Sequence, residues 1–534
     1  MKKLSLLLIS MMSTFFLTAQ TPGTLYQYFG NDGIVLTDFD SNGDDDNASQ
    51  VAVMQDDFKI ILGGNTYMNG TSNLMIARYN PHGSPDMGFG SSGIKVFPFG
   101  GSNDYLTDIA LQPDGKIVAV GYTTGDETSM LAMRLNADGT FDTGFSGNGM
   151  AVIDYGDSIN SWAKSLSILE DGRILISGFI QDYPLSYVKT AMCMLTSTGG
   201  RDFSFGEAGL LTHELPDTWC YPDEMIVHNE KIILGGVYMN TDFERFATVS
   251  RYNLDGSLDM SYGDSGYSAF QLLGDAAISG DANIGMSLTP DGKIVLACNV
   301  YPGWLQSDFA LLKFNADGGI DNSFGIGGIV IQSMGEDSYA RDVIVQADGK
   351  IIACGSYRNP DYDQDDFMIA RYYASGDLDP SFGDYGNGIV ISNLSPENWF
   401  SNAANCAIFC NFDRLIVSGY ARTDHGDPDF AMACYHTGLS VDVDDPEMET
   451  TNLQIYPNPV QDQVRISFNL DQASLVNAKV INSNGQTVAV LADQVIPAGD
   501  HHLKWHCADV RPGIYLLRML IGGEAYTSKI IKSH

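Results

Sequence analysis

Six aspartates recur along the chain, each separated by two residues from the aromatic side chain that follows it. They are Asp86, Asp142, Asp202, Asp259, Asp321 and Asp379. A ring of carboxylates could hold a metal ion or a polar substrate. Alternatively, each carboxylate accepts backbone N–H hydrogen bonds in its own turn, as aspartates often do. We favour the second interpretation, because an active site is needed once and these residues repeat.

Cations recur at the same period, and the same reasoning assigns them to packing rather than to anion binding. They are Arg78, Arg134, Arg251, Lys313 and Arg371.

One acidic loop stands outside this repetition. Its oxygen-bearing residues at alternate positions are Asp38, Asp40, Asn42 and Asp44. Gly43 occupies the sixth position, where a calcium loop turns sharply, but Ser49 stands where the twelfth-position glutamate is expected. The flanking residues are typical of strands rather than helices. Calcium binding and a solvated acidic loop both remain open, and we expect no other cofactor.

Sequence signatures of enzymes are absent. The chain has no G-x-S-x-G elbow, no H-E-x-x-H motif, no Walker loop and no pair of cysteines at zinc spacing. Its histidines are scattered, with His213, His228 and His425 in separate repeats. We therefore expect a protein that is not an enzyme. The alternative is a hydrolase or lyase that assembles acidic residues from several repeats without a linear motif.

The elements that carry these residues are built by repetition. Related segments begin at Arg78, Arg134, Met194, Arg251, Lys313 and Arg371, at steps of 56 to 62 residues. Each repeat also holds a hairpin, clearest in DIALQPDGKIVAVGY (108–122), in which two β-forming runs flank a Pro-Asp-Gly turn. A third strand follows, then the turn that contains the recurring aspartate and aromatic residue, which we call the corner, and then a fourth strand. Four strands per repeat without a helix predict a β-propeller blade.

The number of strands predicts how the ring closes. Seven hairpins occur, but after the last one only the third strand, DFAMACYH (429–436), follows. A surplus strand, Ile34 to Phe39, occurs near the start. If this early strand completes the last blade, seven blades of four strands close without an exposed sheet edge.

Composition and charge limit the partners. The chain of 534 residues has 66 acidic and 29 basic residues, a net charge of −37. This charge argues against nucleic acid, whose binding depends on Lys and Arg. Residues 1–19 begin with Lys2 and Lys3, continue with an apolar run and end in small residues, which predicts a signal peptide. No later apolar run reaches about 18 residues, so we expect no transmembrane segment.

The C-terminal part differs from the repeats. We expect the propeller to span 20–438, an acidic linker to span 439–451, and a second domain to span 452–534. This last part has about seven short strands between Gly-containing turns, which suggests a small β-sandwich.

The repeat as a whole resembles a known family. QPDGKI, followed by DFALLKFN and a corner of the type NADG-x-(L/I)-D-x-SFG, is similar to the delta-60 repeat family of secreted bacterial proteins, which implies a propeller. The resemblance covers Leu25 to His436. Departures are Ser146 after Phe145, Tyr262 in place of Phe, and a fourth hairpin, HNEKI, without Asp-Gly.

The second domain resembles the type A sorting domain of the type IX secretion system of Bacteroidota. The carrying residues are Tyr456, Pro457, Asn458 and Pro459, the turn around Gly485, Pro512, Gly513 and Tyr515, and Lys529 and Lys532. The resemblance implies export through the periplasm, contact with the secretion machinery, and a mature protein that is released or attached to the cell surface.

We therefore expect a secreted or surface-attached binding or structural module, with a polysaccharide-acting hydrolase or lyase as the alternative. Candidate platforms for a glycan or peptide ligand are Trp162, Trp219, Trp304 and Trp399. Each could equally pack between blades.

If the acidic loop binds calcium, the melting temperature of the 21–440 fragment should be higher in millimolar calcium than in EDTA. Equal melting temperatures would exclude the site.

Overall fold

The computed structural model describes most of the chain outside residues 1–20. The described ranges are 21–38, 51–55, 58–68, 70–98, 103–182, 188–214, 218–271, 277–278, 284–301, 306–362, 364–395, 402–411, 414–422, 428–438, 454–458, 460–461, 463–470, 474–482, 487–508, 510–511, 513–521 and 524–532. Within these ranges, no helix has the length and hydropathy that crossing a membrane requires. The described residues form two compact units, a large one ending at Leu439 and a smaller C-terminal one.

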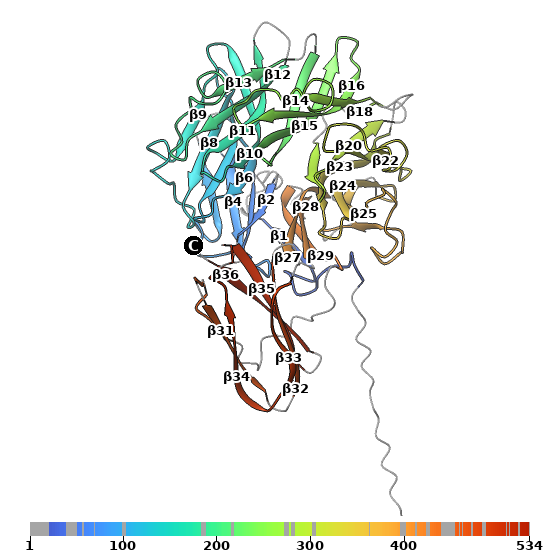
Figure 1. The fold of residues 1–534 in the computed structure, drawn as a ribbon. Helices are drawn as coiled ribbons and strands as arrows, with labels where there is room; N and C mark the ends of the chain where they lie inside the picture. The colour runs from blue at the N-terminus through green and yellow to red at the C-terminus, as the bar shows by residue number, and fades with distance from the viewer. Residues whose placement is uncertain are drawn as a thin grey trace, which may run out of the picture. The chain divides into compact units, whose positions relative to one another are not determined.

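The large unit is a seven-bladed β-propeller, and each blade is an antiparallel sheet (Figure 1). Blades one to three comprise β2 (Val51–Met54), β3 (Ile60–Met68), β4 (Thr71–Tyr79) and β5 (Ile94–Phe97); β6 (Asp104–Leu111), β7 (Ile117–Thr123), β8 (Ser129–Leu135) and β9 (Met150–Ile153); and β10 (Ile159–Ile168), β11 (Ile174–Asp182), β12 (Val188–Leu195) and β13 (Leu210–His213). Blade four comprises β14 (Thr218–His228), β15 (Lys231–Asn240), β16 (Arg245–Asn253) and β17 (Tyr267–Phe270).

Blades five to seven follow the same order. They comprise β18 (Ala277–Ile278), β19 (Gly285–Leu288), β20 (Ile294–Tyr301), β21 (Asp308–Phe314) and β22 (Ile329–Gln332); β23 (Ser338–Val345), β24 (Ile351–Asn359), β25 (Gln364–Tyr372) and β26 (Ile389–Ser392); and β27 (Asn402–Asn411), β28 (Arg414–Arg422) and β29 (Pro428–His436), completed by β1 (Ile34–Thr37). Blade five departs from four strands, because its first strand is divided into β18 and β19, which both pair with β20.

The hairpin turns follow their local sequence. In Gln112–Gly115, Gly115 has a φ of 82° and its N–H donates to the Gln112 carbonyl at 2.9 Å. The fourth hairpin, which lacks Asp-Gly, turns through Asn229 and Glu230, both with positive φ. This is the shorter two-residue turn in which asparagine is well tolerated. The departure in sequence therefore changes the turn and leaves the hairpin intact.

Neighbouring blades pack face to face through apolar side chains that alternate along the strands. Val118 and Val120 of blade two, for example, share a buried cluster with Ala191 and Cys193 of blade three. The corner aromatic is also buried in every blade, including Tyr262, which is 0% exposed in place of Phe. The first strands of all seven blades contact one another in sequence around the propeller axis. The hydrophobic core is therefore a ring of interfaces between sheets.

The N-terminal strand closes the ring, as the strand count predicts. β1 pairs antiparallel with β29, with Val35 opposite Met432 and Thr37 opposite Phe430. In Figure 1 the blue N-terminal strand lies beside the orange strands β27 to β29. Gly30 N–H then donates to the His82 carbonyl of blade one at 2.8 Å, and Gly383 N–H of blade six donates to the Pro22 carbonyl at 2.7 Å. We call the N-terminal segment 21–38 and its pairing with β29 the seam of the ring. The seam is thus bonded to both neighbouring blades.

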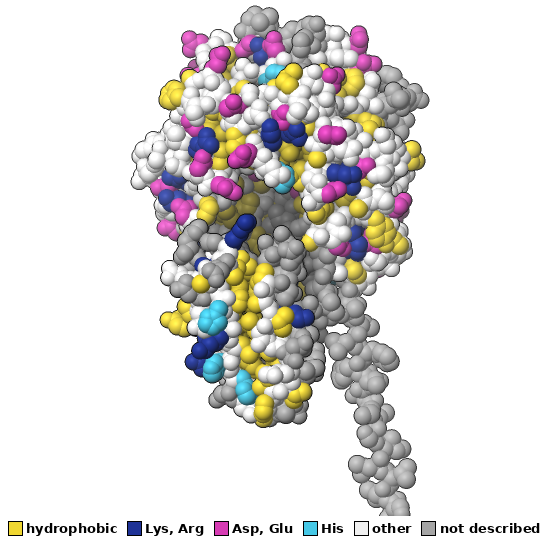
Figure 2. Space-filling view, viewed as in Figure 1, with side chains coloured by type: hydrophobic (Ala, Val, Ile, Leu, Met, Phe, Trp, Pro, Cys, Tyr) yellow, Lys and Arg dark blue, Asp and Glu magenta, His cyan; other side chains and the backbone are white. Residues whose placement is uncertain are grey.

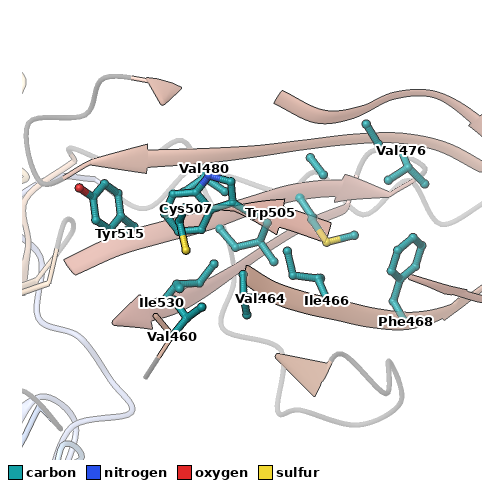
Figure 3. Packing of buried hydrophobic residues seen from close by; sticks show 14 of the residues in the cluster. Val460, Val464, Ile466, Phe468, Val476, Val480, Trp505, Cys507, Tyr515 and Ile530 are labelled. Atoms are coloured by element: carbon teal, nitrogen blue, oxygen red, sulfur yellow. The ribbon is translucent and has the colours of Figure 1, made fainter. Parts of the chain in front are cut away.

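The C-terminal unit is a small β-sandwich with its own core (Figure 3). One sheet has the order β30 (Gln454–Tyr456), β31 (Gln463–Leu470), β34 (Gly499–His506), and the other has the order β33 (Thr487–Ile496), β32 (Ser474–Asn482), β35 (Gly513–Ile521), β36 (Glu524–Lys532). Val464, Ile466 and Trp505 of the first sheet pack with Val480 and Leu517 of the second. This is the predicted architecture.

Removal of β1 should open the ring. A chain that begins at residue 39 is expected to melt at a lower temperature and to aggregate, because β29 becomes an unpaired edge. A chain that lacks only residues 1–19 is the control. A synthetic peptide of residues 21–38 should restore the melting temperature of the shortened chain; a shortened chain that melts like the control would contradict the closure.

Candidate functional site

Each recurring aspartate is the centre of an ion-pair cluster in its corner. In blade two, Asp142 Oδ1 accepts the N–H of Gly144 at 3.0 Å. Asp142 Oδ2 accepts Arg134 Nε at 2.7 Å and Lys116 Nζ at 2.9 Å. The carboxylate therefore joins the hairpin, the third strand and the corner of one blade.

The other corners repeat this arrangement. Cation partners of the remaining aspartates are Lys59 and Arg78 for Asp86, Arg173 for Asp202, Lys231 and Arg251 for Asp259, Lys293 and Lys313 for Asp321, and Lys350 and Arg371 for Asp379. In blade three Met194 replaces the strand cation, and Arg173 of the hairpin holds Asp202. On the face shown in Figure 2, Lys and Arg side chains lie close to Asp and Glu side chains.

The strand cations also reach the following blade. Arg251 Nη1 donates to the Ala316 carbonyl of blade five at 2.8 Å, and Lys313 Nζ donates to the Ala374 carbonyl of blade six at 3.0 Å. Arg78, Arg134 and Arg371 make the equivalent bonds to Ala137, Ser197 and Thr437. The recurring charges thus connect blades, which confirms the structural interpretation of these residues.

These contacts stabilise the ionised carboxylates. The hydrogen bond from Lys116 is the largest influence on Asp142 and, with Gly144 and Arg134, lowers its pKa to about 2. At Asp321 burial acts in the opposite direction, but hydrogen bonds from Lys293 and Ser323 still lower the pKa to about 2. Corner carboxylates are therefore charged at neutral pH and are bound by the cations and N–H groups of their own blade.

The predicted calcium loop lies almost wholly outside the described residues. Asp38 directly follows β1, whereas Asp40, Asn42 and Asp44 belong to residues that the structure does not describe. Within the described ranges, no three His, Cys, Asp or Glu side chains are arranged to hold a metal ion.

Two of the three histidines, His213 and His228, are described, and they lie on different strands of neighbouring blades. His213 lies on the outermost strand of blade three, where its Nδ1 is 2.8 Å from the Tyr252 hydroxyl of blade four. Burial lowers the pKa of His213. His228 ends β14 at the hairpin, and His425 lies outside the described residues. A cavity of about 30 Å³ lies beside His213 and Tyr252.

Two of the four predicted tryptophan platforms lie on the first strands of neighbouring blades, Trp162 on blade three and Trp219 on blade four. The Trp162 ring stacks on Phe179 at 4.9 Å, and Phe179 meets Tyr221 edge to face at 5.7 Å. Trp219 lies two residues before Tyr221 and therefore on the same face of β14. Trp219 stacks on Phe243 at 6.0 Å, and Phe243 is 72% exposed.

We call these five side chains the aromatic row: Trp162, Phe179, Tyr221, Trp219 and Phe243. All five keep exposed surface. They lie at the end of the blades away from the hairpin turns, since Trp162 pairs with Phe179 far from the Ile168–Ile174 pair that precedes the turn. Trp304 and Trp399 lie outside the described residues.

Polar side chains lie deeper on the same first strands, beside β-bulges. The register shifts between Leu106 and Asp108, between Ala163 and Ser165, between Pro222 and Glu224, and between Ala340 and Asp342. A bulge redirects a side chain that would otherwise follow the alternation of the strand. The first strands surround the axis, so the bulges bring polar groups toward it.

Contacts between blades link these groups. Asp108 Oδ2 accepts the Leu166 N–H at 2.7 Å and lies 3.1 Å from the Ser165 hydroxyl. The same hydroxyl lies 3.4 Å from Glu224 Oε1. Lys164 Nζ pairs with Asp223 at 2.9 Å. Blades two, three and four therefore share one polar cluster, which we call the axial cluster: Asp108, Lys164, Ser165, Asp223 and Glu224.

The axial carboxyls are half-buried. Burial is the largest influence on Asp108 and raises its pKa to about 7, and the charge of Asp342 adds to the rise. Burial, followed by the charges of Asp108 and Asp342, raises the pKa of Glu224 well above its usual value. A carboxyl that titrates near neutrality can act in proton transfer.

The sequence analysis did not predict the axial cluster, although the sequence contains a pattern that marks it. In four blades the first strand carries an aromatic residue, two intervening residues and a polar one: Tyr105 with Asp108, Trp162 with Ser165, Tyr221 with Glu224, and Tyr339 with Asp342. This pattern breaks the alternation expected of a strand, because the bulge adds one residue.

The four sorting motifs converge in the C-terminal unit. Asn482, which precedes the turn containing Gly485, pairs with Tyr515, and Gly513 pairs with Lys532. Lys532 also forms a bridge with Val460, which directly follows Tyr456–Pro459. Lys529 lies on β36 opposite Leu516. Tyr456 is 78% exposed, whereas Tyr515 is 7% exposed and donates its hydroxyl to the Arg511 carbonyl. Pro459, Gly485 and Pro512 lie outside the described residues.

Replacing a corner carboxylate should weaken the propeller. Asp142→Asn is expected to lower the unfolding free energy by about 1–2 kcal/mol at pH 7, a value reduced for partial solvent screening. The pKa of Asp142 is depressed, so its contribution is present above about pH 4 and is lost as the pH falls toward about 2. Urea denaturation at pH 7 and pH 2.5 would measure the difference between variant and wild type. Asp114→Asn is the control, because Asp114 lies 3.8 Å from the same Lys116 but is 57% exposed. Equal losses for the two variants at pH 7 would contradict the role of the corner.

Several known structures are similar to this chain at low sequence identity. A protein of unknown function from Dyadobacter fermentans has 11% identity and a TM-score of 0.39, over 76% of this chain and 99% of that one. A PL25 ulvan lyase has 12% identity and a TM-score of 0.42, over 77% and 96%. The β-propeller domain of the trilobed protease from Pyrococcus furiosus has 10% identity and a TM-score of 0.38, over 76% and 99%. No curated protein matches the chain.

Family comparison identifies both parts of the chain. The family described as domain of unknown function (DUF5122) beta-propeller matches residues 55–89, 112–145, 229–262, 289–324 and 346–382. The secretion system C-terminal sorting domain matches residues 454–533, which implies contact with the type IX secretion machinery and secretion or attachment to the cell surface. The protein is thus a β-propeller of DUF5122 repeats joined to a secretion system C-terminal sorting domain.

Proposed function

We propose that the exported propeller is a binding module that takes a glycan on the aromatic row. The observation that carries this proposal is a series of contacting rings, in which Trp162 stacks on Phe179 and Phe179 meets Tyr221 edge to face, and which keeps exposed surface although apolar rings are usually covered. Trp219 and the 72% exposed Phe243 extend the series outward.

The chemistry of the row suits a sugar. Pyranose rings present apolar C–H faces that pack on flat aromatic rings, and their hydroxyls require nearby polar partners. Lys164 and Asp223, which pair at 2.9 Å, follow Trp162 and Tyr221 by two residues on the same strands. The row therefore offers stacking surfaces beside donors and acceptors. A peptide with aromatic or proline residues is the competing ligand.

Loss of the tryptophans should weaken binding. Trp162→Ala and Trp219→Ala are each expected to lower the affinity for a polysaccharide about 5- to 10-fold, the usual value of one aromatic contact. A screen of neutral and acidic polysaccharides and of matrix proteins, followed by calorimetry on the chain without residues 1–19, would identify the ligand and measure the affinity.

The control for this experiment is Phe203→Ala. Phe203 is 75% exposed in the corner of blade three, at the other end of the blade. Equal effects of Phe203→Ala and Trp162→Ala, or saturable binding to matrix proteins alone, would contradict a glycan site on the aromatic row.

The alternative is a polysaccharide hydrolase or lyase. The axial cluster favours it, because the Ser165 hydroxyl lies within 3.1 Å of Asp108 and 3.4 Å of Glu224, and burial raises the pKa of both carboxyls. Groups of this kind serve as general acid and base. Turnover that is lost in Glu224→Gln would establish the enzyme, whereas saturable binding without turnover supports the module.

A further inference from the structure

The contacts of Ser165 impose a limit on the number of protons in the axial cluster. A serine hydroxyl has one proton to donate. Its oxygen lies 3.1 Å from Asp108 Oδ2 and 3.4 Å from Glu224 Oε1, so two carboxyl oxygens compete for that proton. The single proton could be shared in a bifurcated bond, but each contact is a full hydrogen bond only if one of the two carboxyls carries a proton and donates it to the hydroxyl oxygen.

The surroundings decide which carboxyl holds the proton. Asp108 Oδ2 accepts the Leu166 N–H at 2.7 Å, and Asp108 Oδ1 accepts the Ile109 N–H at 2.7 Å. Two backbone donors favour the ionised form of Asp108. Asp108 is also the closer partner of the Ser165 hydroxyl, which leaves Glu224 to act as the donor.

We propose that Glu224 carries a proton at neutral pH and donates it to the Ser165 hydroxyl, and that this shared proton holds the first strands of blades two, three and four together. The proposal is independent of which ligand the aromatic row binds. The site takes a proton, and its loss turns an attractive contact into repulsion between two carboxylates.

Charged and titratable groups lie on several strands around Glu224. Asp108 lies on β6, Tyr122 on β7, Lys164 on β10, Asp223 beside Glu224 on β14, and Arg341 and Asp342 on β23. Lys164 is held by Asp223 at 2.9 Å. The described strands β2 and β19 carry no titratable side chain. The carboxyls therefore outnumber the cations, and the direction in which the pKa of Glu224 moves, upward through burial and the charges of Asp108 and Asp342, agrees with the proton assignment.

The sign of the pH dependence follows. A carboxyl whose pKa is raised on folding contributes stability that is present below its ordinary pKa and is lost as the pH rises through the folded value. Asp108, with a pKa of about 7, changes in the same direction. The propeller should therefore weaken as the pH rises from about 5 through 7 and beyond, in the opposite direction to the corner aspartates.

Infrared spectroscopy of the chain without residues 1–19 tests the proton directly, through the C=O stretch of a protonated carboxyl. We expect this band at pH 7 and its disappearance on alkaline titration. Glu224→Gln should weaken the band at pH 7 and leave only the part that Asp108 contributes, whereas Glu207→Gln, at an exposed position in a corner of blade three, should leave it unchanged. Absence of the band from the wild type at pH 7, or an equally strong band in Glu224→Gln, would overturn the proposal.

A second variant keeps the test decisive if Glu224→Gln does not fold. Asp108→Asn removes the neighbouring charge but keeps an oxygen acceptor, so the remaining band should titrate at a lower pH than in the wild type. If the band of Asp108→Asn titrated at the same pH as that of the wild type, the two carboxyls would not be coupled and the proposal would be overturned. In melting experiments Glu224→Gln should gain stability relative to the wild type as the pH rises from 5 to 9, and a constant difference would count against the proposal.

Discussion

Closure of the ring by β1 is the constraint on which the rest of the propeller depends. Each blade packs on two neighbours, and the last blade lacks a fourth strand until Ile34–Thr37 pairs with β29. The seam also bonds to both sides, through Gly30 to His82 and Gly383 to Pro22. Because the ring joins the two ends of the large unit, every interface between blades depends on this one pairing.

The seam reproduces the corner geometry with different chemistry. Six corners hold an aspartate that pairs with one or two cations, but the seventh has Tyr26 at the equivalent place, three residues before Phe29. Arg414 lies over the Tyr26 ring at 4.2 Å, and His436 meets the same ring edge to face at 5.2 Å. A cation–π contact therefore replaces the ion pair at the seam. The backbone hydrogen bonds, rather than the charges, are common to all seven blades.

The sequence predicted most of the fold because the repeat presents each feature several times. The Pro-Asp-Gly turn, the corner aspartate and the strand cation occur at fixed offsets, so one weak pattern is strengthened by comparison with its copies. The division of the first strand of blade five was not predicted. One continuous strand was expected, and the structure has two, Ala277–Ile278 and Gly285–Leu288. The axial cluster was missed for a related reason: a bulge shifts the alternation, and the residue beside it varies from Asp108 to Ser165 to Glu224.

Positions that are alike in all blades support the fold, whereas positions that differ between blades provide chemistry that belongs to one part of the ring. Corner residues repeat with similar partners in blade after blade: their charges are paired within the corner, and the strand cations also donate to backbone carbonyls of the next blade. Residues beside the bulges differ between blades and meet at the axis, where Asp108 of blade two and Glu224 of blade four share one hydroxyl of blade three. A ring in which every blade was identical would place seven equal charges around its axis, and their repulsion would oppose closure. Variation at the bulges avoids this repulsion, and among the described residues it gives blades two, three and four groups that differ from one blade to the next.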